Sequence, residues 1–191
     1  NDKEINHVHK KNSSATLQNV KININSKGMR GNDIDLQNWQ KSNKRILFIG
    51  SSITLGWGVN EKMVQNKILE RRAKENNLNW ATLNGGIGNY NTERYVKNFL
   101  KNYKDLEPDV VILQYFINDA EVLNHQDGNF FTKNFHLGVF LWKYLAKIKS
   151  DITKESIYDY YKRVYLDEEK SQIVKKNLIN FQNFCKKNDI R

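Results

Sequence analysis

The sequence predicts an α/β protein in which a parallel sheet is covered by helices. Residues 45–49, 80–83 and 109–115 form short apolar runs, long enough for buried strands but too short for helices. Amphipathic stretches with helical spacing separate these runs, and strands that alternate with helices imply right-handed βαβ units. Each run also ends in small or polar residues. The 191 residues suffice for one such domain with a sizeable core.

The N-terminal residues form no part of this alternating pattern. Residues 1–18 are polar and lack periodicity, which is typical of a mobile, solvated arm. His7 and His9 have a spacing that can bind metal on a strand, but no cysteine or carboxylate cluster accompanies them. Residues 20–24 alternate and predict a short strand. We therefore divide the chain into an arm and lead-in segment at 1–40 and an α/β domain at 41–191.

The stretch from 44 to 58 reads as a strand, a tight turn and the start of a helix. The strand ends at Gly50, and Ser51 and Ser52 follow before helical sequence begins. In open α/β sheets, reacting groups collect at the carboxyl ends of strands, where a serine can be exposed and still held rigidly. The same pattern also fits a turn whose serines only cap the next helix.

Three further helices are expected, and each carries apolar residues on one face. Residues 61–76 form the first, and the second follows a glycine-rich stretch at 84–92, with Asn91 or Thr92 as its N-cap. The last helix opens at Asp167 and carries Cys185 on its apolar face. The expected inward residues, helix by helix, are Val64, Ile68, Leu69 and Ala73; Tyr95, Val96, Phe99, Leu100 and Tyr103; and Val174, Leu178, Phe181 and Cys185.

Between the third strand and the last helix the pattern changes. Residues 120–166 are rich in aromatic residues, and we interpret them as a helical insertion that is either a packed subdomain or a cover over a substrate. The sequence ends after the last helix, where a further strand is expected. The α/β domain is therefore predicted to be incomplete at its C-terminal end.

Composition excludes several classes of protein. The net charge of +10 comes from lysines spread along the chain, without an RNA-binding signature or zinc-finger spacing, so we expect no nucleic-acid partner. Cys185 is the single cysteine, which excludes an internal disulfide and suits a core position. No apolar run is long enough to span a bilayer, and no metal or cofactor is predicted. The sequence starts with Asn1 rather than Met, as in a trimmed form, which favours an extracytoplasmic location over a cytoplasmic one.

Three short blocks carry a resemblance to a known family. They are Gly-Ser-Ser-Ile-Thr at 50–54, Asn-Gly-Gly-Ile-Gly-Asn at 84–89 and Phe-Ile-Asn-Asp at 116–119, each after a predicted strand. In this order they resemble the first three blocks of the SGNH/GDSL hydrolases, an esterase and lipase family. A stretch around Arg30 is similar to one that precedes the catalytic strand in a branch of that family. The resemblance implies a flavodoxin-like, three-layer α/β/α sandwich.

The resemblance also implies roles for individual residues. Ser52 takes the position of the nucleophile, and the oxyanion hole is formed by Ser52, Asn89 and Asn118. Ser51, Gly88 and Asp119 are supporting residues. Ser51 stands where the family has an aspartate, Phe116 replaces the usual glycine, and Asn89 is the non-glycine type best able to adopt a positive φ. Each block is also compatible with a simple turn or helix cap.

The family's catalytic base is not identifiable. That base lies in an Asp-x-x-His block near the C-terminus, and these 191 residues contain no such block. Of the four histidines, His7 and His9 lie in the arm, His125 follows the third block too closely, and His136 opens an apolar helix. We interpret the chain as a fragment that ends before the base; a pseudoenzyme is the less favoured interpretation.

Two functions follow from these features. The first is a serine esterase or acyl hydrolase that hydrolyses or transfers an ester or O-acetyl group through an acyl-serine intermediate, on a small-molecule or carbohydrate substrate. The alternative is a catalytically inactive module of the same fold that binds a glycan or a protein partner. A full-length gene sequence distinguishes them, because a downstream Asp-x-x-His favours the enzyme. The sequence does not indicate an oligomeric state.

Overall fold

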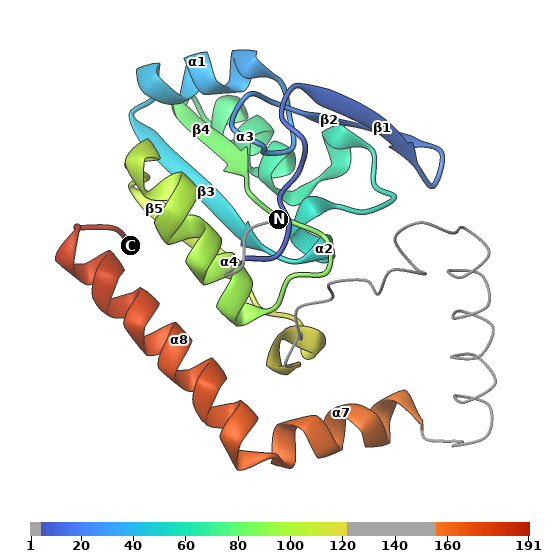
Figure 1. Ribbon diagram of the computed structural model, residues 1–191. Helices are drawn as coiled ribbons and strands as arrows, with labels where there is room; N and C mark the ends of the chain where they lie inside the picture. The colour runs from blue at the N-terminus through green and yellow to red at the C-terminus, as the bar shows by residue number, and fades with distance from the viewer. Residues whose placement is uncertain (1–4, 122–155) are drawn as a thin grey trace.

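A parallel sheet of three strands forms the centre of the computed structural model, which describes residues 5–121 and 156–191 (Figure 1). The strands are β3 (Lys44–Gly50), β4 (Trp80–Asn84) and β5 (Val110–Gln114). Their order is β4-β3-β5, and both pairs are parallel. The three predicted strands are thus confirmed. A first parallel strand between the second and third is the order of a doubly wound sheet, and it is compatible with a flavodoxin-like fold.

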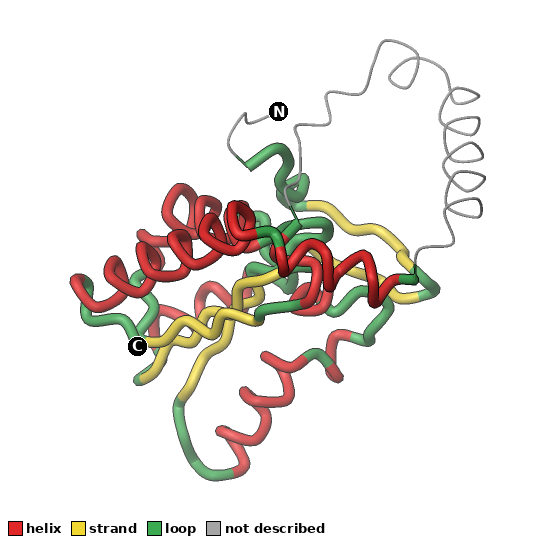
Figure 2. The backbone as a smooth tube through the Cα atoms, turned by 90° about the horizontal axis from the view of Figure 1, so that it is seen from below, coloured by secondary structure: helices red, strands yellow, loops and turns green. Residues whose placement is uncertain are grey.

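Helices cover both faces of this sheet (Figure 2). The helix α3 (Gln65–Glu75) packs on β4, where Asn66 and Thr82 are hydrogen-bonded. On the other face α4 (Thr92–Asn98) packs against α8 (Glu168–Lys187). Side chains of successive strand residues point to opposite faces, so β3 supplies apolar groups to both layers. Its buried residues are Ile46, Leu47, Phe48 and Ile49.

Several short helices connect these elements. The helix α2 (Ser52–Leu55) follows β3 directly, and 3-10 turns occupy Glu61–Met63, Lys104–Leu106 and Ile117–Ala120. A π-helical segment, Phe99–Tyr103, continues α4. Its first ring, Phe99, lies edge-on to Phe181 of α8 with centroids 5.1 Å apart. The predicted helix at 61–76 is therefore a 3-10 turn followed by α3, and Asn91 is the N-cap of α4.

From residue 5 onwards the N-terminal segment is part of the fold, which corrects the prediction of a solvated arm for the described residues. The strands β1 (Ser13–Leu17) and β2 (Val20–Ile24) form an antiparallel hairpin. Ile5 is only 1% exposed and belongs to the main core. The prediction was wrong because it relied on the polar composition of this segment. Ile5 is nevertheless buried in the core, and β1 pairs with β2. The helix α1 (Asp33–Lys41), opened by an Asn32 capping box, was also not predicted.

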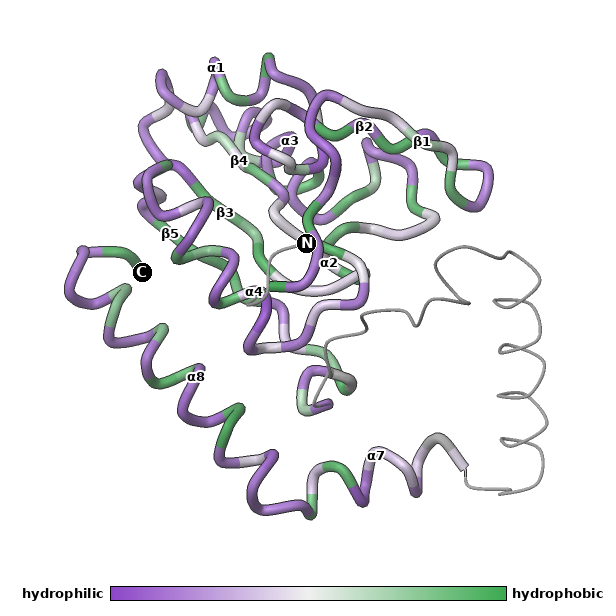
Figure 3. Tube along the Cα trace, viewed as in Figure 1, coloured by the Kyte–Doolittle hydropathy of each residue, from purple (hydrophilic) through white to green (hydrophobic). Residues whose placement is uncertain are grey.

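The C-terminal part of the described chain consists of α7 (Ile157–Leu166) and α8. Asp167 is the N-cap of α8 and accepts from the backbone N–H of Lys170, as the sequence predicted for a helix that opens there. Hydrophobic and hydrophilic residues alternate along α8 (Figure 3), and its apolar face buries Phe181 and Cys185. Most of the predicted insertion at 120–166, including His125 and His136, lies outside the described residues.

β5 lies at one edge of the described sheet and is less buried than β3 and β4. Ile112 is 36% exposed. Arg191 donates its N–H to the Asp109 carbonyl at 3.1 Å and accepts from the Val111 N–H at 2.8 Å. Arg191 is thus hydrogen-bonded to both Asp109 and Val111, two residues apart on the neighbouring chain segment. This is the hydrogen-bond pattern of parallel strands. Among the described helices, none is long and apolar enough to cross a membrane.

Candidate functional site

Ser52 lies at the carboxyl end of the central strand, as the first residue of α2. Its side chain is half-buried, whereas Ser51 before it is only 1% exposed. Ser51 is the N-cap of α2, but its hydroxyl makes no hydrogen bond within the described residues. If the two serines served only as helix caps, the Ser51 hydroxyl should accept a hydrogen bond from a backbone N–H of α2. It accepts none from these residues, so the structure does not support that interpretation for Ser51.

The loop after β4 lies directly against the backbone of α2. A Cβ on Gly86 would collide with the backbone nitrogen of Leu55, so only glycine allows this approach. Asn84 holds the two segments together: its side-chain amide donates to the Thr54 carbonyl at 2.7 Å, and its oxygen accepts from the Gly86 N–H at 3.0 Å. The first and second sequence blocks are therefore brought together by buried polar contacts.

The same loop carries Gly88 and Asn89. Asn89 has a φ of 59°, the left-handed conformation that asparagine tolerates best among non-glycine residues. Its side chain is exposed, and Gly88 is half-buried. The left-handed backbone is the geometry that the sequence comparison required if asparagine replaces glycine at this position.

A cavity of about 750 Å³ joins these residues to the N-terminal hairpin. Ser52, Gly88 and Asn89 line one side of it, and apolar side chains of β1, β2 and α2 line the rest. Trp57, 46% exposed, stands at this cavity as well. The structure thus brings Ser52, Gly88 and Asn89 of the predicted site into one hollow with a largely apolar wall.

His7 and His9 line the same cavity. The Nε2–H of His7 donates to the Gly88 carbonyl at 2.9 Å, and the Tyr90 hydroxyl donates to the His7 carbonyl. The rings of His7 and Tyr90 lie edge-on, with centroids 5.1 Å apart. These hydrogen bonds and the ring contact connect the segment around His7 to the loop that carries Asn89.

His9 is held by the turn that carries Gly28. Its Nδ1–H donates to the Gly28 carbonyl at 3.2 Å, which in the neutral ring leaves Nε2 as an acceptor. Burial lowers the pKa of His9 below its ordinary value and outweighs the Gly28 hydrogen bond, while nearby His7 lowers it further. His9 is consequently a neutral, unprotonated base at neutral pH.

Arg30 holds the C-terminal end of α2 through hydrogen bonds from its side chain. Its guanidinium is 4% exposed and donates to the carbonyls of Leu55 and Gly56 at 2.7 Å each and to that of Val59 at 2.7 Å. The Gly56 carbonyl also accepts from the Val59 N–H at 3.0 Å, whereas the Leu55 and Val59 carbonyls depend on Arg30 as their donor among the described residues. Burial lowers the pKa of Arg30, although neighbouring Glu61 opposes this, and the group stays charged. Arg30 fixes the helix that begins at Ser52 and does not reach the cavity lining.

The third block forms the 3-10 turn Ile117–Ala120 after β5. Asp119 is 1% exposed; it accepts from the Phe116 N–H at 2.8 Å and from the Tyr95 hydroxyl at 3.1 Å. Burial raises its pKa to about 6, against the effect of both hydrogen bonds. The backbone of Asn118 belongs to this turn, but its side chain lies outside the described part of the structure, so its predicted role as an oxyanion donor remains a prediction.

The strand register brings the ends of the three strands together. Asn84 at the end of β4 pairs with Phe48, and Gln114 at the end of β5 pairs with Gly50. The three carboxyl ends are therefore neighbours at one edge of the sheet. The sequence missed His7 and His9, because a contact over 81 residues, such as that of His7 with Gly88, leaves no local pattern.

The site contains no evident metal centre. No group of three or more histidine, cysteine or acidic side chains gathers within residues 5–121 and 156–191. The single described cysteine, Cys185, is buried in the core, and burial raises the pKa of its thiol.

Comparison with known proteins gives little beyond this geometry. The sequence matches no family model and no curated protein. Among solved structures, it is similar to the crystal structure of TesA, with 17% sequence identity and a TM-score of 0.38. That similarity covers 40% of this chain and spans 43% of the length of the TesA chain.

Proposed function

We propose that the chain is an acyl hydrolase or acyltransferase of the SGNH type in which Ser52 forms an acyl intermediate. One observation carries the proposal: Ser52, at the carboxyl end of β3, shares a cavity with the left-handed Asn89 loop. Nucleophilic catalysis needs a hydroxyl that faces the substrate, and the oxyanion needs donors that are fixed in advance. Buried contacts at Asn84 and Arg30 fix both segments.

In this mechanism the Ser52 hydroxyl attacks the carbonyl carbon of an ester. The negative charge that develops on the carbonyl oxygen is stabilised by the backbone N–H groups of Ser52 and Asn89, and by the side-chain amide of Asn118. Loss of the alcohol gives the acyl-serine, which water or an acceptor alcohol then cleaves. The cavity admits a small or carbohydrate ester.

Ser52 also requires a base within hydrogen-bonding reach. Within the described residues, the histidines that line the cavity are His7 and His9. The Nε2 of His7 is committed to Gly88, whereas neutral His9 keeps Nε2 free. His9 is therefore the better described candidate for a proton acceptor.

Hydrolysis of p-nitrophenyl acetate by the 191-residue chain tests this proposal. We expect Ser52→Ala to abolish the activity and Ser13→Ala to preserve it. Ser13 is a matched control, because it lines the same cavity and its hydroxyl donates only to the Lys10 carbonyl. Equal activity of the wild type and Ser52→Ala would remove the acyl-serine mechanism.

The same assay identifies the base. If His9 accepts the proton, His9→Gln loses the activity, while His7→Gln acts only through the position of the Asn89 loop. If neither substitution changes the rate, neither histidine is the base. A chain without any measurable hydrolysis would fit the binding module predicted as the alternative, and equally an enzyme whose base lies in the C-terminal block that the family resemblance implies.

A further inference from the structure

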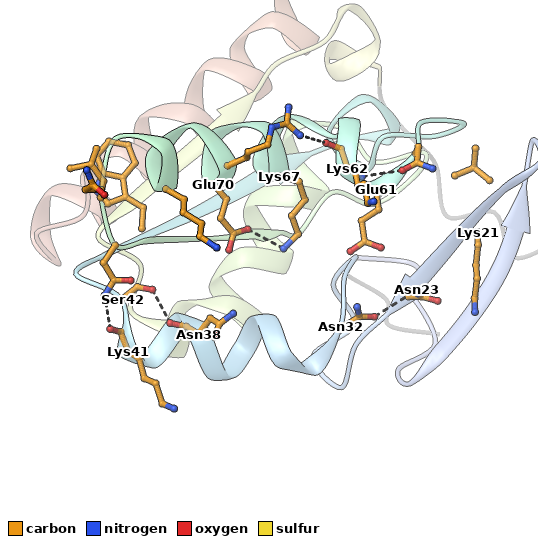
Figure 4. A pocket seen from close by; sticks show the side chains of 18 of the residues that line it. Lys21, Asn23, Asn32, Asn38, Lys41, Ser42, Glu61, Lys62, Lys67 and Glu70 are labelled. Carbon is orange, nitrogen blue, oxygen red and sulfur yellow. Dashed lines mark hydrogen bonds and ion pairs between the residues drawn. The ribbon is translucent and has the colours of Figure 1, made fainter.

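A second and larger cavity lies on the other side of the hairpin from Ser52, between α1 and α3 (Figure 4). Its volume is about 1250 Å³, above the roughly 300–1,000 Å³ usual for small-molecule sites. Lys21 and Asn23 of β2 line it, together with Val20 at the start of the strand, whereas Ile22 and Ile24 line the Ser52 cavity. Successive side chains of a strand point to opposite faces, so β2 lies between the two cavities. Its polar side chains face the second cavity, and Ile22 and Ile24 face the apolar Ser52 cavity.

One basic side chain in this second cavity is already neutralised. Lys67 lies 2.9 Å from the Asp35 carboxylate and 3.0 Å from that of Glu70. This network joins α1 to α3, and Figure 4 shows Lys67 and Glu70 on the α3 side. Because Lys67 is paired with two carboxylates, it offers no positive charge to a ligand.

Other basic side chains in the lining keep their charge available. Lys21, Lys62 and Lys74 are exposed and form no ion pair with any residue that the structure describes. Arg71 donates to a neutral acceptor, the Lys62 carbonyl, at 3.3 Å. Besides Glu70, the acidic residue in the lining is Glu61. The cavity is consequently positive, and a positive concave surface attracts anions.

The remaining lining is rich in amides. Asparagines such as Asn23, Asn38 and Asn77 line the cavity from the hairpin, α1 and the end of α3. Each amide offers two donors and an acceptor, which suit hydroxyl groups. Trp80 is the one aromatic side chain in the lining among the described residues, whereas single-stranded nucleic acids are bound by series of stacked aromatic rings.

We propose that this cavity binds a strand of acidic polysaccharide, with lysines paired to its carboxylates and asparagines bonded to its hydroxyls. The size fits several sugar units, the free charges fit an anionic polymer, and the scarcity of aromatic rings disfavours nucleic acid. The proposal does not depend on the chemistry of Ser52, because β2 separates the two cavities and binding can be measured without turnover.

The test is equilibrium binding of the whole chain to polygalacturonate oligomers, with neutral dextran oligomers and single-stranded RNA as comparison ligands. We expect polygalacturonate to bind in a salt-dependent manner and dextran to bind far more weakly. The triple variant Lys21→Gln, Lys62→Gln and Lys74→Gln should weaken polygalacturonate binding by about tenfold or more.

A second triple variant is the matched control. Lys176→Gln, Lys186→Gln and Lys187→Gln remove the same net charge from exposed positions on α8, outside the cavity, and should change affinity less than about twofold. Equal weakening by both triple variants would show general charge attraction and overturn the proposal. So would absence of polygalacturonate binding, or tighter RNA binding that depends on the three cavity lysines.

Discussion

Arg30 gives the sharpest test of how the Ser52 segment is held. Its guanidinium donates three hydrogen bonds of 2.7 Å to carbonyls at and after the end of α2, and it is 4% exposed. A hydrogen bond from a charged group contributes about 1.5–3 kcal/mol, and a buried acceptor left without a donor costs about 1–3 kcal/mol. Because the three bonds belong to one group, their losses do not simply add.

We expect Arg30→Met to lower the free energy of unfolding by about 3–5 kcal/mol. Methionine fills much of the same space but leaves the Leu55 and Val59 carbonyls without the Arg30 donor, while the Gly56 carbonyl keeps the Val59 N–H at 3.0 Å. Arg30→Lys should fall between this variant and the wild type, since an ammonium group cannot reproduce the planar fork. Urea unfolding, followed by circular dichroism, gives the free energies and their m-values.

Arg71→Met is the control for the loss of a guanidinium. Arg71 also donates to a backbone carbonyl, that of Lys62 at 3.3 Å, but it is exposed. Its substitution should change stability by no more than about 0.5 kcal/mol. If Arg30→Met costs less than about 1 kcal/mol, or no more than Arg71→Met, then Arg30 does not anchor α2.

Two further predictions concern the turn after β5 and the loop after β4. Burial raises the pKa of Asp119 to about 6 from 3.8, so the folded state binds the proton more tightly, and stability should rise by about 2 kcal/mol as the pH falls from 7 to 4.5. In urea melts at a series of pH values, Asp119→Asn should remove this rise in the free energy of unfolding. If the rise is unchanged in the variant, another group causes it. Gly86→Ala should cost more than about 2 kcal/mol, because its Cβ meets the Leu55 backbone, and Gly88→Ala should be nearly neutral, because its Cβ meets only the Trp57 ring at 3.8 Å. Similar melts for the two alanine variants would contradict this packing.

The sequence predicted the central sheet well because its signals are local. Strands at 45–49, 80–83 and 109–115 are short apolar runs bounded by glycine, asparagine or proline, and all three form the parallel strands of the fold. The Asn91 cap and the buried face of α4 were predictable for the same reason. Each depends on residues within a few positions of one another.

The N-terminal part could not be predicted in this way. Residues 13–17 form a strand only because they pair with 20–24, and Ile5 is buried only because the core lies beneath it. That His7 and His9 line the same cavity as Ser52 depends on contacts with Gly88 and Gly28, not on a local pattern. The contacts of Arg30 with α2 likewise join residues far apart in the sequence and leave no local pattern.

Of the predicted site, the structure describes some residues fully and others in part. Ser52, Gly88 and Asn89 share one cavity, and Ser51 and Asp119 are buried; their supporting roles stay predictions. The side chain of Asn118 lies outside the described residues, as do His125 and His136. The roles of these residues in catalysis stay predictions until activity is measured.

The most direct test of the central claim is covalent labelling of Ser52. The wild-type chain is incubated with a fluorophosphonate, which phosphonylates activated serines, and the modified peptide is mapped by mass spectrometry. We predict one adduct, on Ser52, that is absent from Ser52→Ala and unaffected by Ser13→Ala. Labelling at another serine, or no labelling of a folded chain that hydrolyses p-nitrophenyl acetate, would contradict the assignment of Ser52 as the nucleophile.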